Sequence, residues 1–220
     1  MKKVVFLTCL FFSLTKVYSQ DRNYGFAVGF YSGIKVEYFT YQGDFNGKTF
    51  FYTDAAEIFV PKIEPGIAYG LQLGFKFRGA SWDFGYQLSS HHYSHENGYS
   101  GTMLIHLIKC SGFTVYLNPP KKIRPYLGFD FSSTWMHIKD GAYGIDSYSG
   151  QNDKSYYGGL IFGLGAGLEL NISKKFSFHL ESIPSWLFLT DVKGITKKYW
   201  EVEKFSSFRP NISAGLYYNF

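Results

Sequence analysis

Six consecutive residues, His91-His92-Tyr93-Ser94-His95-Glu96, bring together side chains that could do chemistry. In an extended chain His92 and Ser94 point to the same side, and an acid, Glu96, is close behind them. A serine activated by a histidine and an acid is a nucleophile. The three histidines could equally bind a metal ion, but no fourth ligand is evident. The polar start of a loop explains the same residues, so we predict neither a catalytic nor a metal site and keep His92, Ser94 and Glu96 as weak catalytic candidates.

Gly163, Gly165 and Gly167 have the G-x-G spacing of a nucleotide-binding loop. They lie inside an alternating, strand-like segment that no helix follows, whereas a phosphate-binding loop leads directly into a helix. We therefore expect no cofactor.

The elements that position these residues follow from a period-two pattern that is plainest in residues 207–220. One face of this segment is apolar and the other is polar, as in a β-strand. The apolar parity holds Phe208, Pro210, Ile212, Ala214, Leu216, Tyr218 and Phe220, and the polar parity holds Arg209, Asn211, Ser213, Gly215, Tyr217 and Asn219. The same alternation recurs upstream, with glycine prominent on the second face.

Counting these segments gives eight expected strands. They cover residues 24–40, 66–77, 82–89, 102–117, 126–135, 159–170, 176–188 and 207–220. Short turns at 78–81, 118–123 and 171–175 alternate with long connections at 42–64, 139–155 and 191–206, and the connection near 94–101 is intermediate. Outer-membrane barrels show this asymmetry, with short periplasmic turns and longer extracellular loops.

The segment 102–117 departs from regular alternation. Met103, Ile105 and Leu107 share a face with Lys109 and Ser111, before Phe113, Val115 and Leu117 resume the apolar face. A β-bulge near Ser111-Gly112 would shift the phase of part of the strand, and its register stays open.

Residues 1–19 have the features of a secretory signal peptide, with Lys2 and Lys3 ahead of an apolar run and small residues before Gln20. We expect residues 20–220 to form a single domain. Removal of the signal takes three lysines and leaves 19 basic against 17 acidic residues, a net charge of +2. A nucleic-acid partner thereby loses its main electrostatic support.

Composition and cysteine content agree with export. Aromatic residues make up 21% of the chain, with 24 glycines, which is unusual for a soluble domain. Cys9 leaves with the signal peptide, so Cys110 has no partner for an intramolecular disulfide.

A soluble β-sandwich would also alternate, but its outer face would carry lysine, glutamate, threonine and serine rather than glycine. Glycine suits a crowded, strongly curved interior, which places the aromatic face outside against lipid. We predict an all-β fold, an eight-stranded antiparallel up-and-down transmembrane β-barrel in the outer membrane of a Gram-negative cell.

The inner face of this barrel collects polar and charged residues. They are Lys35, Glu37, Gln72, Lys76, Asp83, Gln87, Asp130, Glu169, His179, Glu181, Arg209 and Asn211. They could line a pore, but eight strands enclose only enough space for their own side chains. We therefore expect a paired polar network that fills the lumen. Aromatic residues near strand ends are expected to form interfacial girdles: Tyr69, Trp82, Tyr93, Trp135, Tyr157 and Trp186.

Several motifs carry a resemblance to a known group. They are Ser19-Gln20, Arg124-Pro125-Tyr126-Leu127-Gly128, the alternation from Gly159 to Glu169, and the closing Ala214-Gly215-Leu216-Tyr217-Tyr218-Asn219-Phe220. With them the chain resembles the bacterial outer membrane protein β-barrel domain family (porin-family, PorT-like), related in architecture to the OmpA/OmpX-type small barrels. The resemblance implies Leu216, Tyr218 and Phe220 as a signal for the barrel-assembly machinery. It also implies contact with outer-membrane lipid and lipopolysaccharide.

We expect a non-enzymatic barrel with a structural or surface-interaction role carried by its extracellular loops, whose ligand is unknown. Two alternatives stay open. One is a narrow passive, porin-like channel. The other is a lipid A-modifying enzyme, because an outward His-x-Ser with a nearby acid is similar to the site of outer-membrane lipid A deacylases.

Overall fold

The computed structural model describes residues 29–43, 49–53, 56–59, 62–94, 100–140, 156–193 and 206–220. The expected signal peptide lies outside these ranges. All regular elements within them are β-strands, and none of the described residues belongs to a helix long and apolar enough to cross a membrane.

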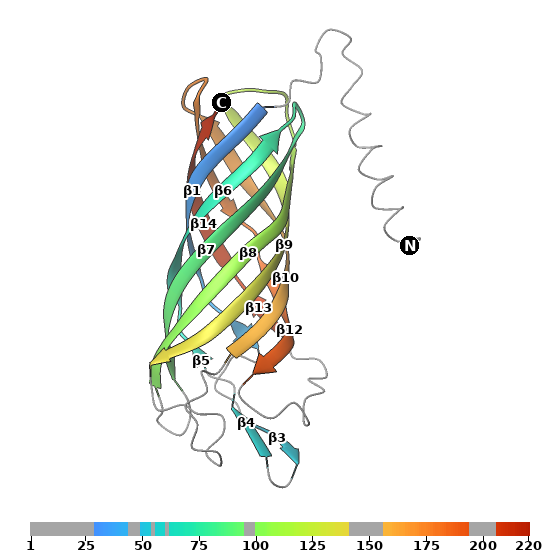
Figure 1. Ribbon diagram of the computed structural model, residues 1–220. Coiled ribbons are helices and arrows are strands. Elements are labelled where there is room, and N and C mark those ends of the chain that lie inside the picture. Colours follow the sequence, from blue (N-terminus) through green and yellow to red (C-terminus); the bar gives the residue numbers. More distant parts are fainter. Residues whose placement is uncertain are drawn as a thin grey trace, which may run out of the picture.

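Long strands form the wall of a tall, closed barrel (Figure 1). Six of them are β1 (Gly29–Phe39), β6 (Gly66–Lys76), β7 (Ala80–Ser94), β8 (Ser100–Tyr116), β9 (Ile123–Asp140) and β10 (Tyr156–Asn171). Each of these strands pairs antiparallel with the next one in this series. Strands β1 and β6 pair in this way although four short strands lie between them in the sequence. Large and β-branched apolar residues alternate with small or polar ones along these strands, which suits a wall with two different faces.

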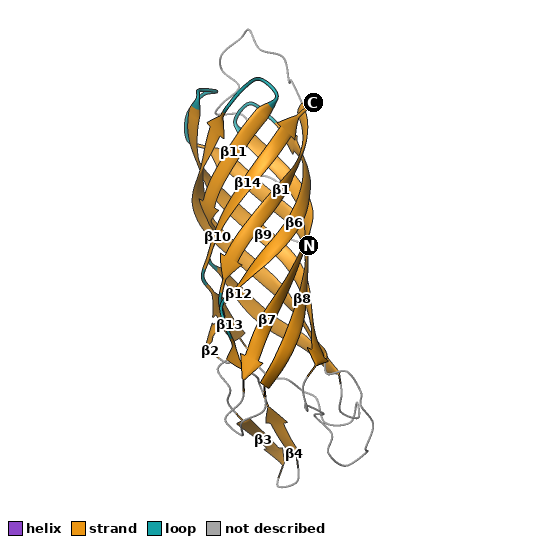
Figure 2. Cartoon of the chain, turned by 90° about the vertical axis from the view of Figure 1, so that its left-hand side faces the viewer, coloured by secondary structure: helices purple, strands orange, loops and turns teal. Residues whose placement is uncertain are grey.

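The last two spans are each broken into two pieces (Figure 2). These pieces are β11 (Phe176–Ser182) with β12 (Ser185–Lys193), and β13 (Ser206–Arg209) with β14 (Asn211–Asn219). The breaks fall at Pro184 and Pro210, because proline has no N–H group to donate to a strand ladder. Strand β10 pairs with both β11 and β12, and β14 pairs with β1, so the ring closes with eight antiparallel spans.

The expected connections differ from the structure at their edges. Strand β9 continues to Asp140 and β12 to Lys193, so the connections predicted at 139–155 and 191–206 are shorter than expected. Within 42–64 the chain forms four short strands. They are β2 (Gln42–Gly43), β3 (Thr49–Thr53), β4 (Ala56–Phe59) and β5 (Lys62–Ile63). Here β2 extends the wall beside β13, β5 pairs with β7, and β3 and β4 form a separate sheet beyond the barrel end (Figure 1).

The irregular strand β8 contains the expected bulge, one residue earlier than predicted. Lys109 pairs with Ser132 and Ser111 with Phe131, which makes Cys110 the extra residue. Before the bulge Met103, Ile105 and Leu107 face inward together with Lys109, and after it Ser111 faces outward. The shared face of this segment is therefore the inner face as far as Lys109.

The two faces of the wall have the expected characters. Large apolar side chains are exposed on the outside of every span, for example Ile34 at 57%, Leu71 at 64% and Leu164 at 64%. Charged side chains such as Lys35 and Glu37 are buried on the inside. Burial of charge and exposure of leucine and isoleucine reverse the arrangement of a soluble protein, so the outer face is suited to lipid.

Two of the aromatic residues expected in the interfacial girdles are wrongly placed by that prediction. Tyr93 and Tyr157 are 0% and 1% exposed and lie inside the barrel. Both occupy inward positions of their strands, and nearness to a strand end alone does not tell the two faces apart. Tyr69, Trp82 and Trp186 are exposed on the outer face, and Trp135 is partly exposed.

Gly165 offers a direct test of the break between β11 and β12. A Cβ at this position would meet the backbone of Ser182 and Ile183, which cannot move aside as a flexible side chain can. Gly165→Val is therefore expected to lower the free energy of unfolding by about 1–3 kcal/mol, the usual cost of overpacking. Denaturant titration in detergent, followed by the mobility difference between unboiled and boiled samples on a gel, measures this loss.

The neighbouring Ala166→Val supplies the matched control, because Ala166 is exposed on the lipid-facing side. It should unfold at nearly the wild-type denaturant concentration. An equal loss in both variants would contradict the close approach at Gly165.

Candidate functional site

The lumen holds the charged side chains that the structure buries, and it is the candidate functional site. Two names describe its ends. The turn end is the end that carries the short connections at 77–79, 117–122 and 172–175, and the loop end is the opposite one (Figure 1). The inward residues of one strand follow one another along the barrel, so their order in the chain gives their distance from the turn end.

Lys109 lies between two carboxylates near the middle of the lumen. Its Nζ is 2.9 Å from Oδ1 of Asp83 and 2.7 Å from Oδ1 of Asp130. Asp83 also accepts hydrogen bonds from Gln72 Nε2 at 3.2 Å and from the hydroxyl of Tyr31 at 3.3 Å. Its carboxylate therefore has the several partners that a buried charge requires.

A second group of ions lies beside it. Lys35 Nζ is 2.6 Å from Oε1 of Glu181, whose Oε2 accepts a hydrogen bond from the Tyr126 hydroxyl at 2.6 Å. Oε1 of Glu37 is 2.9 Å from Arg209 Nη2 and accepts a hydrogen bond from Asn211 Nδ2 at 2.8 Å. The contacts of Glu181 with Lys35 and Tyr126 each reach past one intervening strand, β14 and β10 respectively, so they join strands that the backbone ladder does not pair directly.

Glu169 gathers a third group nearer the turn end. It is 0% exposed, and Lys76 Nζ lies 2.9 Å away, Arg124 Nη1 3.7 Å and His179 Nε2 3.5 Å. The guanidinium of Arg124 stacks on the ring of Tyr116, 3.6 Å from its centroid. Arginine can stack and form ion pairs at the same time because its guanidinium is planar.

The structure brings the sequence-predicted polar residues together on the inner side. All twelve project inward, and Lys109 and Arg124 join them although the sequence did not indicate either. Because of the bulge at Cys110, the alternation of this strand did not show that Lys109 faces inward. Arg124 lies at the start of β9, where the end of the turn is hard to tell from the start of the strand. With both included the charged set, here called the ionic network, has five acids and five bases. They are Glu37, Asp83, Asp130, Glu169 and Glu181, and Lys35, Lys76, Lys109, Arg124 and Arg209.

Glycines make room for large rings within this network. A Cβ at Gly74 would collide with the ring of Tyr31, and one at Gly167 would collide with the ring of Tyr126. Tyr217 lies equally close to Gly33 and donates a hydrogen bond to Gln72. The small residues of the inner face thus leave space that tyrosines fill.

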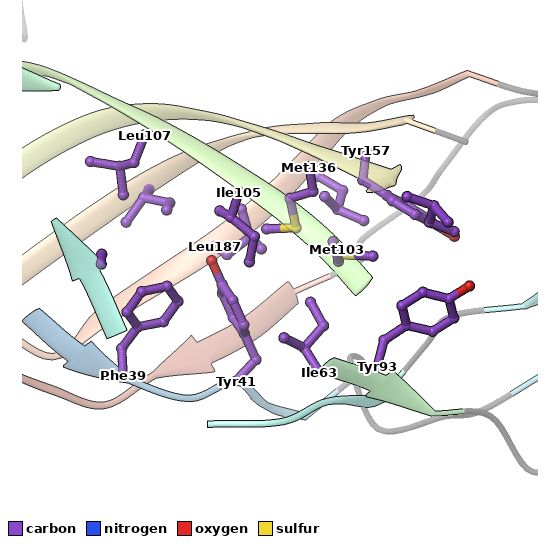
Figure 3. Close-up of a cluster of buried hydrophobic side chains, with 14 residues drawn as sticks. Phe39, Tyr41, Ile63, Tyr93, Met103, Ile105, Leu107, Met136, Tyr157 and Leu187 are labelled. Atoms are coloured by element: carbon purple, nitrogen blue, oxygen red, sulfur yellow. The ribbon is translucent and has the colours of Figure 1, made fainter. Parts of the chain in front are cut away.

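Toward the loop end the same inward rows become apolar, a change that the expected polar lumen does not include. Figure 3 shows side chains from opposite sides of the barrel meeting across the lumen. This apolar plug consists of Phe39, Tyr41, Ile63, Ala68, Tyr93, Met103, Ile105, Leu107, Met136, Ile138, Tyr157, Ile161, Leu187 and Leu189. Met103, Met136, Tyr93 and Leu187 are all 0% exposed. The plug therefore closes the lumen from wall to wall at this level.

Arg209 connects the ionic network to the plug. Its guanidinium carbon is 3.9 Å from the centroid of Phe39, a cation–π contact, while its Nη2 pairs with Glu37. A cavity of about 10 Å³ lies at this level, between Lys35, Lys109, Leu107 and Ile161. That is room for about one water molecule and not for a solute.

The weak catalytic candidates do not form a relay in the described part of the chain. His92 is exposed on the outer face and Ser94 is partly buried, and no hydrogen bond joins their side chains. Glu96 lies outside the described residues. His91, which the motif also contains, points inward, and its Nδ1 is 2.9 Å from the carbonyl oxygen of Glu64. The described residues hold no group of three or more histidine, cysteine or acidic side chains placed to bind a metal ion.

The three residues implied as an assembly signal lie on the outer side of β14 and just beyond it. Leu216 is 43% exposed and Phe220 78%, and the ring of Tyr218 packs against that of Phe220 with centroids 5.0 Å apart. Their exposure leaves them accessible, and their role in assembly stays a prediction.

Comparisons with known proteins agree with this architecture. No protein-family model matches the chain, and no curated protein matches it either. Among solved structures, the chain is similar to Neisserial surface protein A, with 10% identity, a TM-score of 0.56 and coverage of 88% of this chain and 99% of the other. It is also similar to the outer membrane protein OprG from Pseudomonas aeruginosa, with 13% identity, a TM-score of 0.56 and coverage of 89% and 97%.

At these identities the likeness concerns the fold. In addition to this likeness, the chain has a closed ring of eight spans, a buried ionic interior and an apolar outer face. Only a closed barrel lets strands cross a bilayer with every backbone group paired. The chain has the fold of the small eight-stranded outer-membrane barrels and is an integral outer-membrane β-barrel.

Proposed function

We propose that this protein is a closed, non-enzymatic outer-membrane barrel that supports surface interactions at its loop end and does not conduct solutes. The observation that carries the proposal is the filling of the lumen at two levels, by the ionic network and by the apolar plug. Ions that reached the plug would have to shed their water against methionine, isoleucine and leucine, and hydrophobic constrictions of this kind stop conduction.

The loop end supplies the surface for interaction. Strands β3 and β4 form a two-stranded sheet of their own that projects beyond the wall (Figure 2). Five of the nine residues in these strands are phenylalanine, tyrosine or isoleucine. Aromatic residues are enriched where proteins bind other molecules, which favours recognition at this end over transport through the lumen.

The proposal also includes contacts of the barrel with membrane lipids and with the machinery that inserts it. The outer face would meet outer-membrane lipid along its height and lipopolysaccharide at the loop end, which is the extracellular side of such barrels. Insertion would proceed through the barrel-assembly machinery.

Planar-bilayer recording tests the closed lumen. The purified barrel should give no stable conductance steps, because the apolar plug leaves no continuous wet path. A porin of larger lumen, recorded in the same bilayers, shows that the assay detects open channels. Reproducible steps from the wild-type protein would refute the closed lumen and favour the narrow channel.

The ionic network should act in stability and not in permeation. Lys109→Met leaves Asp83 and Asp130 buried without their shared cation, and loss of one partner from a buried pair costs about 3–5 kcal/mol of the free energy of unfolding. Denaturant titration in detergent measures the loss. Adding Asp83→Asn and Asp130→Asn removes the uncompensated charge and should restore most of it. A single variant as stable as the wild type would show that Lys109 does not hold the two strands.

Lipid A analysis tests the absence of enzymatic activity. Mass spectra of lipid A from cells that make the wild-type protein and from cells that make Ser94→Ala should be identical. No hydrogen bond joins the side chains of His92 and Ser94, so no activated serine is expected. An acyl chain removed only by the wild-type protein would establish the deacylase alternative.

A further inference from the structure

The three short connections at the turn end carry charge of a single sign. Together they hold five basic residues and no acidic one: Arg78, Lys121, Lys122, Lys174 and Lys175. All five side chains are exposed. We call these residues the basic rim. In contrast, the residues between described strands at the loop end, 44–48, 54–55, 60–61, 95–99, 141–155 and 194–205, contain seven acids and five bases.

The basic rim is built on a rigid support. The Tyr116 amide donates to the carbonyl oxygen of Gly79 at 2.9 Å, and the Asn171 amide donates to that of Lys122 at 2.8 Å. The Asn219 amide donates to the carbonyl oxygen of Lys175 at 2.7 Å. Each connection is thereby fixed to a neighbouring strand, so little backbone entropy opposes the binding of a ligand.

Apolar side chains set the depth of the rim in the bilayer. Leu117 and Ile123 flank one pair of lysines and are 53% and 55% exposed, and Ile172, beside the other pair, is 59% exposed. Lys175 also lies 5.9 Å from the ring centroid of Tyr218. Exposed aliphatic groups stay in the acyl region while lysine amines extend to the headgroups, so the rim lies at headgroup level.

Internal carboxylates do not neutralise the rim. Glu169 in the adjacent part of the lumen is fully buried and already engaged by Lys76 and Arg124. The four lysines of the rim therefore face the membrane surface, and no carboxylate among the described residues forms an ion pair with them.

We propose that the basic rim binds anionic glycerophospholipids, of the phosphatidylglycerol type, in the leaflet at the turn end. Positive charges next to a membrane attract anionic lipid electrostatically, and lysine and arginine donate hydrogen bonds to phosphate oxygens. The depth set by Leu117, Ile123 and Ile172 favours a membrane lipid over a soluble anion. This inference does not depend on whether the lumen conducts or on what binds at the loop end.

Fluorescence quenching by brominated lipids tests the proposal. Trp82 lies on the outer face close to the turn end and is 41% exposed. Replacing Trp135, Trp186 and Trp200 by Phe leaves it as the sole reporter. This protein is folded into phosphatidylcholine vesicles that contain either brominated phosphatidylglycerol or brominated phosphatidylcholine, and the gel mobility shift confirms that it is folded.

Phosphatidylglycerol should quench Trp82 with a relative association constant about fivefold or more above that of phosphatidylcholine, about what one Lys contact with an anionic surface provides. Changing all five rim residues to Gln should abolish the preference, and 1 M salt should weaken it. The control changes Lys48, Lys154, Lys197, Lys198 and Lys204 to Gln and should keep the preference. Soluble glycerol phosphate at matched concentration should not displace the lipid.

Equal quenching by the two lipids in the unmodified rim would overturn the proposal. So would a preference that survives the five substitutions in the rim, or one that the control variant loses to the same extent. Displacement by soluble glycerol phosphate would assign the rim to a free anion instead of a lipid.

Discussion

Closing a sheet of eight strands creates an interior that its own side chains must fill, and the rest of the structure depends on this constraint. Five carboxylates and five cations meet there, each within reach of partners from other strands. Buried charges are tolerated only when they are paired and hydrogen-bonded. The network thus specifies the register of the strands, since a slip of one residue would turn a charge toward lipid.

The interior is divided along the barrel axis. Rings and ions fill the half toward the turn end, where glycines such as Gly74 and Gly167 leave space for tyrosines. Aliphatic, methionine and aromatic side chains fill most of the half toward the loop end. Arg209 spans the boundary, with its charge on Glu37 and its flat face on Phe39. Charged residues inside this barrel are therefore confined to one part of its height.

The outside is divided as well. Apolar side chains cover the wall, the turn end carries only basic connections, and the loop end carries both signs. An integral barrel contacts three environments: the hydrocarbon core of the membrane and the two membrane surfaces, which differ chemically. The distribution of side chains on this wall matches that order of environments.

Alternation along the chain was enough to predict the number of spans, the inner and outer parity of most residues and all five lumen acids, because a strand repeats every two residues. It predicted only three of the five lumen bases. The bulge at Cys110 shifts the phase of Lys109, and Arg124 lies where a turn becomes a strand. The placement of Tyr93 and Tyr157 in an apolar plug, and not in a girdle, follows from the folded barrel. Alternation says which residues share a face, whereas closure of the ring decides what each of them meets across the lumen.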